Sequence, residues 1–121
     1  MEEFNEETLK AHINKLNHKE LLILKFTASW CVPCKTIKPI CDEYIQKLPE
    51  AISFYEIDID DSLELYVKLK KLKMINGVPA LLAYSNQNKS NGLWYVPMFS
   101  HLGGNIANTR QFFNGCLRFV N

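Results

Sequence analysis

The sequence predicts an α/β fold in which a mixed sheet of about four to five strands carries helices on both faces. Short apolar segments alternate with segments of helical periodicity along the first part of the chain, which indicates parallel strand–helix–strand units. Later, two strand-like segments flank a polar turn and predict an antiparallel hairpin. The chain has 121 residues, 47% of them hydrophobic, which favours a single domain over residues 1–121 with its own core.

The first three predicted elements are a helix, a buried strand and a longer helix. Residues 6–16 carry apolar side chains at helical spacing, and Asn5 precedes them as an N-cap. Residues 21–27 are almost all apolar, as in a strand that is covered on both faces. Lys25 is the one charged residue among them. Residues 32–48 have the length and periodicity of a long helix.

A second strand and a third helix come next. Residues 52–59 are rich in β-branched and aromatic side chains, which favour a strand. Residues 60–62, Asp-Asp-Ser, supply capping groups for a helix over residues 63–72. Asp58 belongs to the same acidic run. We expect strand-end and capping roles for this run, because its spacing lacks the pattern of a calcium loop.

The remaining elements form the predicted hairpin and a final helix. The sequence predicts a strand over residues 80–84, a polar turn over 85–92 and another strand over 93–99. Pro97 cannot donate to a ladder, so the last strand should lie at a sheet edge. The final helix, over residues 105–119, should pack through its apolar side chains Ile106, Phe112, Phe113 and Leu117.

Charge and hydropathy argue against two classes of partner. The net charge is +1, so no basic surplus holds nucleic acid or anionic lipid. The longest apolar run, residues 21–24, is far shorter than the roughly 20 residues of a membrane helix. The first seven residues lack the basic and apolar stretches of a signal peptide. We therefore expect a reducing, cytoplasmic location, and neither a nucleic-acid nor a membrane partner.

One motif carries chemistry: Trp30-Cys31-Val32-Pro33-Cys34-Lys35, where the buried strand gives way to a helix. Free backbone amides and the helix dipole stabilise a thiolate on Cys31 at that point. Two intervening residues leave Cys34 close enough for a disulfide. Pro33 fits the first helical turn, where its missing N–H costs nothing. A Cys-x-x-Cys pair beside a strand–helix unit of an intracellular protein indicates redox chemistry.

A structural zinc site is the alternative use of such a pair. Zinc needs four ligands, usually two such pairs, but Cys41 and Cys116 are isolated and the three histidines show no paired spacing. We therefore expect no metal and no cofactor. Cys41 and Cys116 are expected to be packed core thiols. An exposed Cys116 that links two copies is the alternative, so we expect a monomer or a weak homodimer.

Residues 27–39 resemble the active-site stretch of the thioredoxin family, closest to its eukaryotic cytosolic members. Residues 52–61 are similar to the family's next strand, and Val78-Pro79 is similar to its substrate-side proline. The resemblance is good over residues 21–84 and implies a thioredoxin-like fold. It also implies that Cys31 is the attacking thiolate and Cys34 the resolving thiol.

The same resemblance implies a substrate-binding surface around the cysteine pair. Trp30 would offer a flat apolar contact, Pro79 would follow a cis bond, and the backbone of Val78 would pair with an extended substrate segment. Gly103-Gly104 is similar to a glycine pair with which glutaredoxins hold glutathione. We favour a plain loop-to-helix turn at that position.

The chain departs from the family pattern at two positions that could tune the redox chemistry. Lys25 stands where the family usually has a buried aspartate, and a charged lysine near the cysteines would favour their reduced form. Glu56, in the adjacent strand, could pair with it; the alternative is that Lys25 reaches solvent. Val32 replaces a glycine between the cysteines, and with Pro33 it could tune the potential. We favour a surface role for Val32, in partner contact.

These residues predict a thiol–disulfide oxidoreductase that acts on protein disulfides, as a reductase that a separate reductase recycles. Lys25 favours one alternative, an oxidising disulfide carrier that an oxidase would recharge. A second alternative is a binding module of this fold with little turnover, which the intact Cys31 and Cys34 oppose. A third is glutathione-coupled reduction, against which Trp30 argues.

Overall fold

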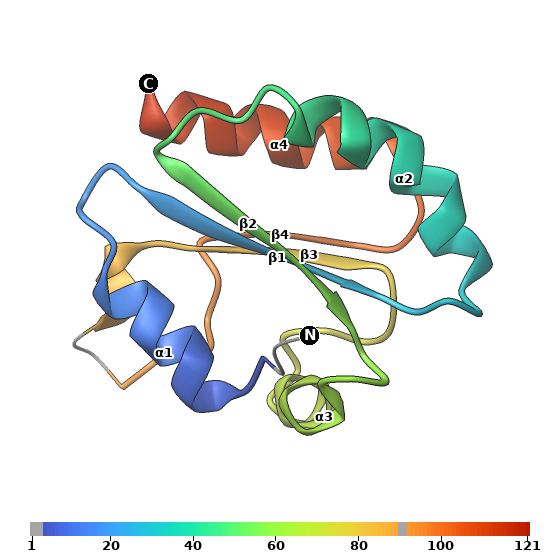
Figure 1. Ribbon diagram of the computed structural model, residues 1–121, viewed down its shortest axis with the longest axis horizontal. Coiled ribbons are helices and arrows are strands. Elements are labelled where there is room, and N and C mark those ends of the chain that lie inside the picture. The colour runs from blue at the N-terminus through green and yellow to red at the C-terminus, as the bar shows by residue number, and fades with distance from the viewer. Residues whose placement is uncertain (1–3, 90–91) are drawn as a thin grey trace.

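The computed structural model describes residues 4–89 and 92–121, which form a central sheet between two layers of helices (Figure 1). In chain order the elements are α1 (Glu6–Asn14), β1 (Leu21–Thr27), α2 (Val32–Ile45), β2 (Ile52–Asp58), α3 (Leu63–Lys71), β3 (Ala80–Tyr84), the 3₁₀ helix η1 (Asn86–Lys89), β4 (Phe99–Leu102) and α4 (Ile106–Val120). The strand order is β2-β1-β3-β4. Helices α2 and α4 cover one face of the sheet, and α1 and α3 cover the other, which confirms the predicted fold class.

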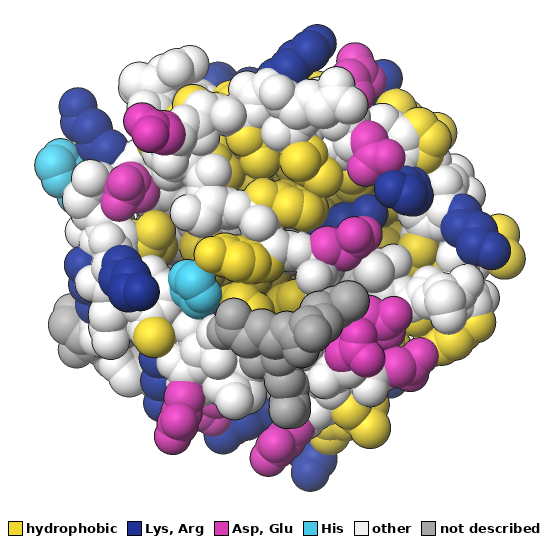
Figure 2. All heavy atoms as spheres, viewed as in Figure 1, with side chains coloured by type: hydrophobic (Ala, Val, Ile, Leu, Met, Phe, Trp, Pro, Cys, Tyr) yellow, Lys and Arg dark blue, Asp and Glu magenta, His cyan; other side chains and the backbone are white. Residues whose placement is uncertain are grey.

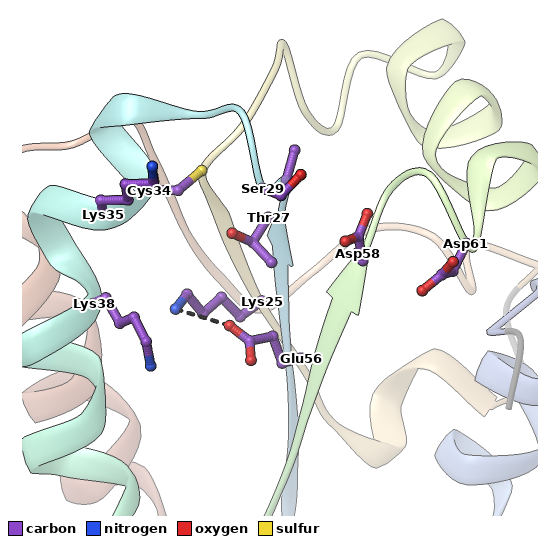
Figure 3. Close-up of a pocket in the computed structure, with 10 residues that line it drawn as sticks. Lys25, Thr27, Ser29, Cys34, Lys35, Lys38, Glu56, Asp58 and Asp61 are labelled. Atoms are coloured by element: carbon purple, nitrogen blue, oxygen red, sulfur yellow. Dashed lines mark hydrogen bonds and ion pairs between the residues drawn. The ribbon is translucent and has the colours of Figure 1, made fainter. Parts of the chain in front are cut away.

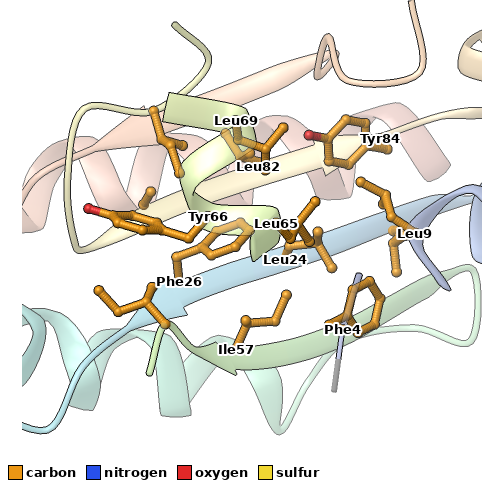
Figure 4. Packing of buried hydrophobic residues seen from close by; sticks show 14 of the residues in the cluster. Phe4, Leu9, Leu24, Phe26, Ile57, Leu65, Tyr66, Leu69, Leu82 and Tyr84 are labelled. Carbon is orange, nitrogen blue, oxygen red and sulfur yellow. The ribbon is translucent and has the colours of Figure 1, made fainter. Parts of the chain in front are cut away.

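Strand β1 lies in the centre of the sheet, parallel to β2 and antiparallel to β3, and its bounds are those predicted. Successive side chains of a strand point to opposite faces. Leu22, Leu24 and Phe26 therefore join the core beneath α1 and α3 (Figure 4). Leu21 and Ile23 join the core beneath α2 and α4. A strand that anchors both cores explains its nearly continuous apolar sequence.

The last strand begins later than the sequence predicts. The prediction of a strand over residues 93–99 is wrong, because β4 spans Phe99–Leu102. Antiparallel pairing with β3 starts where the Met98 N–H donates to the Ala83 carbonyl at 2.7 Å. Pro97 thus lies just before the strand. The edge position of the strand is confirmed, since β4 pairs with β3 alone among the described residues.

The segment between β3 and β4 is organised by the buried side chain of Asn88. Its Oδ1 accepts from the Ser85 N–H at 3.2 Å, and its Nδ2 donates to the carbonyls of Leu93 at 3.0 Å and Val96 at 2.7 Å. These bonds hold the backbone in turns, which explains why residues 93–98 form no strand. Residues 90 and 91, which belong to the predicted turn over 85–92, lie outside the described part of the chain. Residues 1–3 of the acidic start also lie outside it.

Several predicted helix ends differ by up to three residues. Helix α2 ends at Ile45 rather than at residue 48, because the backbone bonds that follow span three residues instead of four. The Lys47 N–H donates to the Tyr44 carbonyl, and the Leu48 N–H donates to the Ile45 carbonyl. Pro49 follows, and a residue before proline disfavours helical backbone. Helix α1 likewise closes with a bond from the Leu16 N–H to the Ile13 carbonyl.

Two predicted side-chain roles are corrected. Ser62 precedes α3, but its hydroxyl makes no bond to the start of that helix. It accepts from the Phe4 N–H at 2.9 Å and so ties down the N-terminal segment. Ile106 is 43% exposed, so α4 packs through Phe112 and Phe113 but not through Ile106. The N-cap prediction for α1 is confirmed, since Asn5 Oδ1 accepts from the Thr8 N–H at 2.8 Å.

The surface shows no field of one sign on the face drawn in Figure 2. Lysine, arginine, aspartate and glutamate side chains are interspersed there, and hydrophobic side chains come to the surface between the sheet and the layer of α2 and α4. No helix within residues 4–89 or 92–121 is long and apolar enough to cross a membrane.

We expect Asn88→Ala to lower the free energy of unfolding by about 2 kcal/mol. The change removes three hydrogen bonds, one from the buried Ser85 N–H and two to the partly buried carbonyls of Leu93 and Val96, and each such bond contributes on the order of 1 kcal/mol. Urea unfolding followed by circular dichroism measures the loss. The control is Gln87→Ala, whose side chain is exposed in the same 3₁₀ helix, and which should change the stability by less than about 0.5 kcal/mol. Equal stabilities for the two variants would contradict this account of the segment.

Candidate active site

The two motif cysteines lie where the loop after β1 enters α2. Cys31 is the N-cap of α2, and Cys34 lies in the first turn, with 5.3 Å between their Cα atoms and a disulfide between their sulfurs. The Cys34 N–H points at Cys31 Sγ at 3.2 Å. In the reduced form this amide and the helix dipole would stabilise a Cys31 thiolate. Pro33 occupies the first turn, where no carbonyl within the helix needs its N–H.

The disulfide is nearly buried, but the residues around it are exposed. Cys31 and Cys34 are 4% and 3% exposed, whereas Trp30 and Val32 are 63% and 70% exposed. Large apolar side chains that project into solvent beside a reactive pair suit contact with another protein. The exposure of Val32 agrees with the surface role that we favoured for it.

A second segment reaches the motif from β3, the neighbour of β1, whose first residue Ala80 pairs with Phe26. The peptide bond between Val78 and Pro79 is cis, and the Pro79 carbonyl accepts from the Gly103 N–H at 2.9 Å. Gly103 has a φ of 99°, a conformation that favours glycine. A methyl group on Gly104 would lie 3.0 Å from the Cβ of Pro33. The turn over residues 103–104 therefore ties the Val78–Pro79 segment to the motif.

This turn is the part of the site that sequence reasoning missed. Gly103-Gly104 was expected to be only a turn before the last helix. The glycine pair was the available signal, but its contact with Pro33 arises from tertiary packing. Leu102 and Ile106, which flank this turn, are 37% and 43% exposed. Together with Trp30 and Val32 they are the exposed apolar side chains that we call the apolar rim.

On the α2 side of the sheet, a pocket of about 370 Å³ lies beneath Cys34 (Figure 3). Lys25 points into it from β1 and meets Glu56 of β2, with 3.2 Å between Lys25 Nζ and Glu56 Oε1. The parallel register pairs these two residues directly. The Lys25 side chain is 2% exposed and the Glu56 side chain 51%. Of the two expectations for Lys25, the ion pair is therefore the one that forms.

The other two cysteines are packed in the core beneath α2 and α4. Cys41 and Cys116 are both fully buried, as expected. Burial raises the pKa of the Cys41 thiol, and it raises the pKa of Cys116 to about 12. The alternative of an exposed Cys116 that links two copies is wrong, since its sulfur is enclosed between α4 and the sheet.

The acidic run after β2 shapes the backbone. Asp58 Oδ1 accepts from the Asp60 N–H at 2.9 Å, and the Ser62 N–H donates to the Asp58 carbonyl at 3.1 Å. Within the part of the chain that the structure describes, no three His, Cys, Asp or Glu side chains gather as a metal site would require.

Comparisons with known proteins all point to one family. The family model described as Thioredoxin matches residues 1–94. The protein "Thioredoxin H-type" of Fagopyrum esculentum is 38% identical over 61 residues, which cover 50% of this chain and 48% of that protein. "Thioredoxin-1" of Saccharomyces cerevisiae is 31% identical over 67 residues, 55% of this chain and 60% of that protein. The chain thus spans about half the length of the curated relatives it matches.

A solved structure agrees with the sequence comparisons over nearly the whole chain. The solution structure of oxidised thioredoxin from Plasmodium falciparum superposes with a TM-score of 0.64 at 25% identity. The superposition covers 92% of this chain and 91% of that one, so the similarity in fold extends beyond the segments aligned by sequence.

We expect Gly104→Ala to destabilise the protein by about 1 kcal/mol, because the new methyl group presses on Pro33. Urea unfolding measures the change. Gly115→Ala is the matched control: a methyl group there meets its nearest atom at 3.9 Å, and alanine favours the interior of α4. The control should be as stable as the parent or more so. A Gly104→Ala variant that is equally stable would show that the turn does not press on the motif.

Proposed function

The chain belongs to the thioredoxin family, and we propose that it is a thiol–disulfide oxidoreductase that acts on protein disulfides. The observation that carries the proposal is the Cys31–Cys34 disulfide at the N-terminus of α2, nearly buried beneath an exposed apolar rim. On reduction, a disulfide in this position gives an attacking thiol whose thiolate the helix N-terminus stabilises, and a second thiol within reach of it.

As a reductase, the protein would act in two exchange steps. The Cys31 thiolate attacks one sulfur of a substrate disulfide, which forms a mixed disulfide and releases the other substrate sulfur as a thiolate. The Cys34 thiolate then attacks Cys31 Sγ, which re-forms the Cys31–Cys34 bond and releases the second substrate thiolate. Substrate gains two electrons and the protein loses two. We propose that a separate reductase returns these electrons, and that the cycle runs in the cytoplasm.

The apolar rim would bind the substrate segment that carries the disulfide. Trp30 and Val32 project from the motif, and Leu102 and Ile106 from the opposite side. The backbone of Val78, which precedes the cis bond, would pair with an extended segment of the substrate, as in strand addition. Pro33 would hold the first turn of α2 in place, so that the Cys34 amide stays on Cys31 Sγ.

One observation favours a second function, that of an oxidising disulfide carrier. Lys25 places a buried positive charge on the pocket beneath Cys34. A positive charge stabilises thiolates, and a stabilised reduced form makes the disulfide more oxidising. Glu56 offsets that charge from its half-exposed position, which favours the reductase. The balance between Lys25 and Glu56 would set the direction of electron flow.

Cys34→Ser is expected to trap the protein on its substrate. The variant retains the Cys31 nucleophile but cannot resolve the mixed disulfide, so a covalent complex that dithiothreitol releases should accumulate. Turnover with a protein disulfide such as insulin should fall by at least about 100-fold in this variant and in Cys31→Ser. Cys41→Ala, which removes a fully buried thiol, is the control and should retain turnover. A double Cys31→Ser, Cys34→Ser variant with full biological activity would instead indicate a binding module.

The reduction potential of the Cys31–Cys34 pair decides the direction of exchange. Equilibration in defined dithiol buffers should give a value near the thioredoxin level of about −270 mV if Glu56 offsets the charge of Lys25. The carrier predicts a value well toward about −120 mV, which Lys25→Asp would make more reducing. A potential that Lys25→Asp does not change would exclude Lys25 from redox control.

A further inference from the structure

Lys25 is a buried cation whose nitrogen lies between the central sheet and the helix that carries both motif cysteines. Its position in β1 turns the side chain toward α2, the face on which Leu21 and Ile23 also lie. Its side chain is 2% exposed, and its nitrogen contacts the Glu56 carboxylate. This ion pair, at 3.2 Å, compensates the burial of the lysine charge.

The pocket connects this ammonium to the resolving cysteine. Cys34 lies at one end of the pocket and the Lys25–Glu56 pair at the other (Figure 3). The charged groups that face it are Lys25 from β1, Lys35 and Lys38 from α2, Glu56 and Asp58 from β2, and Asp61 from the following loop. Of these, Lys25 is the one whose side chain is buried. A volume of about 370 Å³ holds several waters, so a proton that leaves Cys34 has a way to solvent.

The field of Lys25 extends along the inner face of α2. Cys34, Ile37 and Cys41 are the buried residues of that face. Burial raises the pKa of the Cys41 thiol, and the charge of Lys25 is the largest influence that acts against this rise. Cys34 lies on the same face, on the pocket into which Lys25 points.

We propose that Lys25 is a positioning residue for the resolving step, in which its ammonium, held by Glu56, stabilises the thiolate of Cys34. This inference rests on the proposed exchange of disulfides and names the group that activates its second thiol. The N-terminus of α2 acts on Cys31, because the Cys34 amide lies against Cys31 Sγ. Lys25 acts on the other sulfur from the pocket. The two thiols are therefore activated by separate groups.

The step balances as follows. Cys34 in the mixed disulfide loses its proton to water in the pocket, and the resulting thiolate faces the pocket that the Lys25 ammonium enters from the other end. It attacks Cys31 Sγ, the bond between Cys31 and the substrate sulfur breaks, and the substrate leaves as a thiolate. Lys25 gains and loses no proton, so its effect is on the fraction of Cys34 that is ionised.

The experiment titrates Cys34 alone. In a Cys31→Ser, Cys41→Ala background, thiolate absorbance at 240 nm is followed over roughly pH 5 to 9, a range in which Cys116, whose pKa burial raises to about 12, stays protonated. Adding Lys25→Met should move the midpoint up by about one pH unit or more, a tenfold loss of thiolate below the midpoint. Lys38→Met is the matched control. It removes an exposed charge of the same pocket and should move the midpoint by less than about 0.3 unit.

Each outcome decides the proposal. A midpoint that Lys25→Met leaves unchanged overturns it, and so does an equal shift from Lys38→Met, which would reflect only the general charge of the pocket.

Lys25→Met should fold, since an apolar side chain of similar length replaces a buried ion. If thermal unfolding shows that it does not, Lys25→Gln supplies the same comparison. Insulin reduction by the unsubstituted protein at high pH, where thiols ionise unaided, tests the exchange activity separately: its absence would refute the proposed function, not the role of Lys25.

Discussion

The burial of β1 on both faces is the constraint on which the rest of the structure depends. The strand pairs with β2 on one side and β3 on the other, and its side chains enter both cores alternately. It fixes where the chain leaves the sheet, at Thr27, and so the start of α2, whose N-cap Cys31 lies four residues later. The same constraint makes Lys25 significant. An ion in the middle of such a strand must be paired, and the register supplies Glu56.

The two members of that ion pair differ in solvent exposure, and this difference determines which charge is felt inside the protein. The Lys25 side chain is 2% exposed and that of Glu56 51%, so water and salt screen the anion more than the cation. Attraction between them is enough to hold Lys25 in place, yet Glu56 cannot fully cancel its field inside the protein. Lys25 is therefore the less screened charge of the pair at the pocket that Cys34 lines. Because of this asymmetry, the charge of Lys25 can act on a thiolate at the pocket. In a pair whose two members were equally buried, the two charges would cancel there.

Sequence reasoning succeeded where a local signal matched the tertiary outcome. Continuous apolar runs gave the bounds of β1 and β3, and the cysteine spacing placed the motif at the start of a helix. It failed where distant backbone groups decide the structure. The segment over residues 93–99 has the composition of a strand, but Asn88 binds two carbonyls of that segment and holds it in turns. The contact of Gly104 with Pro33 joins segments far apart in the chain, so no local pattern could reveal it.

The connection between β3 and β4 and the candidate active site lie at opposite ends of the sheet. Strand β3 runs antiparallel to β1, so Tyr84 pairs with Leu22 at one end and Ala80 with Phe26 at the other. The long connection after Tyr84 therefore leaves from the end remote from the cysteines and packs against α1, where Lys10 lies over the Trp94 ring. Strand β4 then brings the chain back, with Leu102 opposite Ala80, and delivers the glycine turn to Pro33. The connection can thus change in length and sequence without moving the site, because the return strand and not the connection fixes the position of that turn.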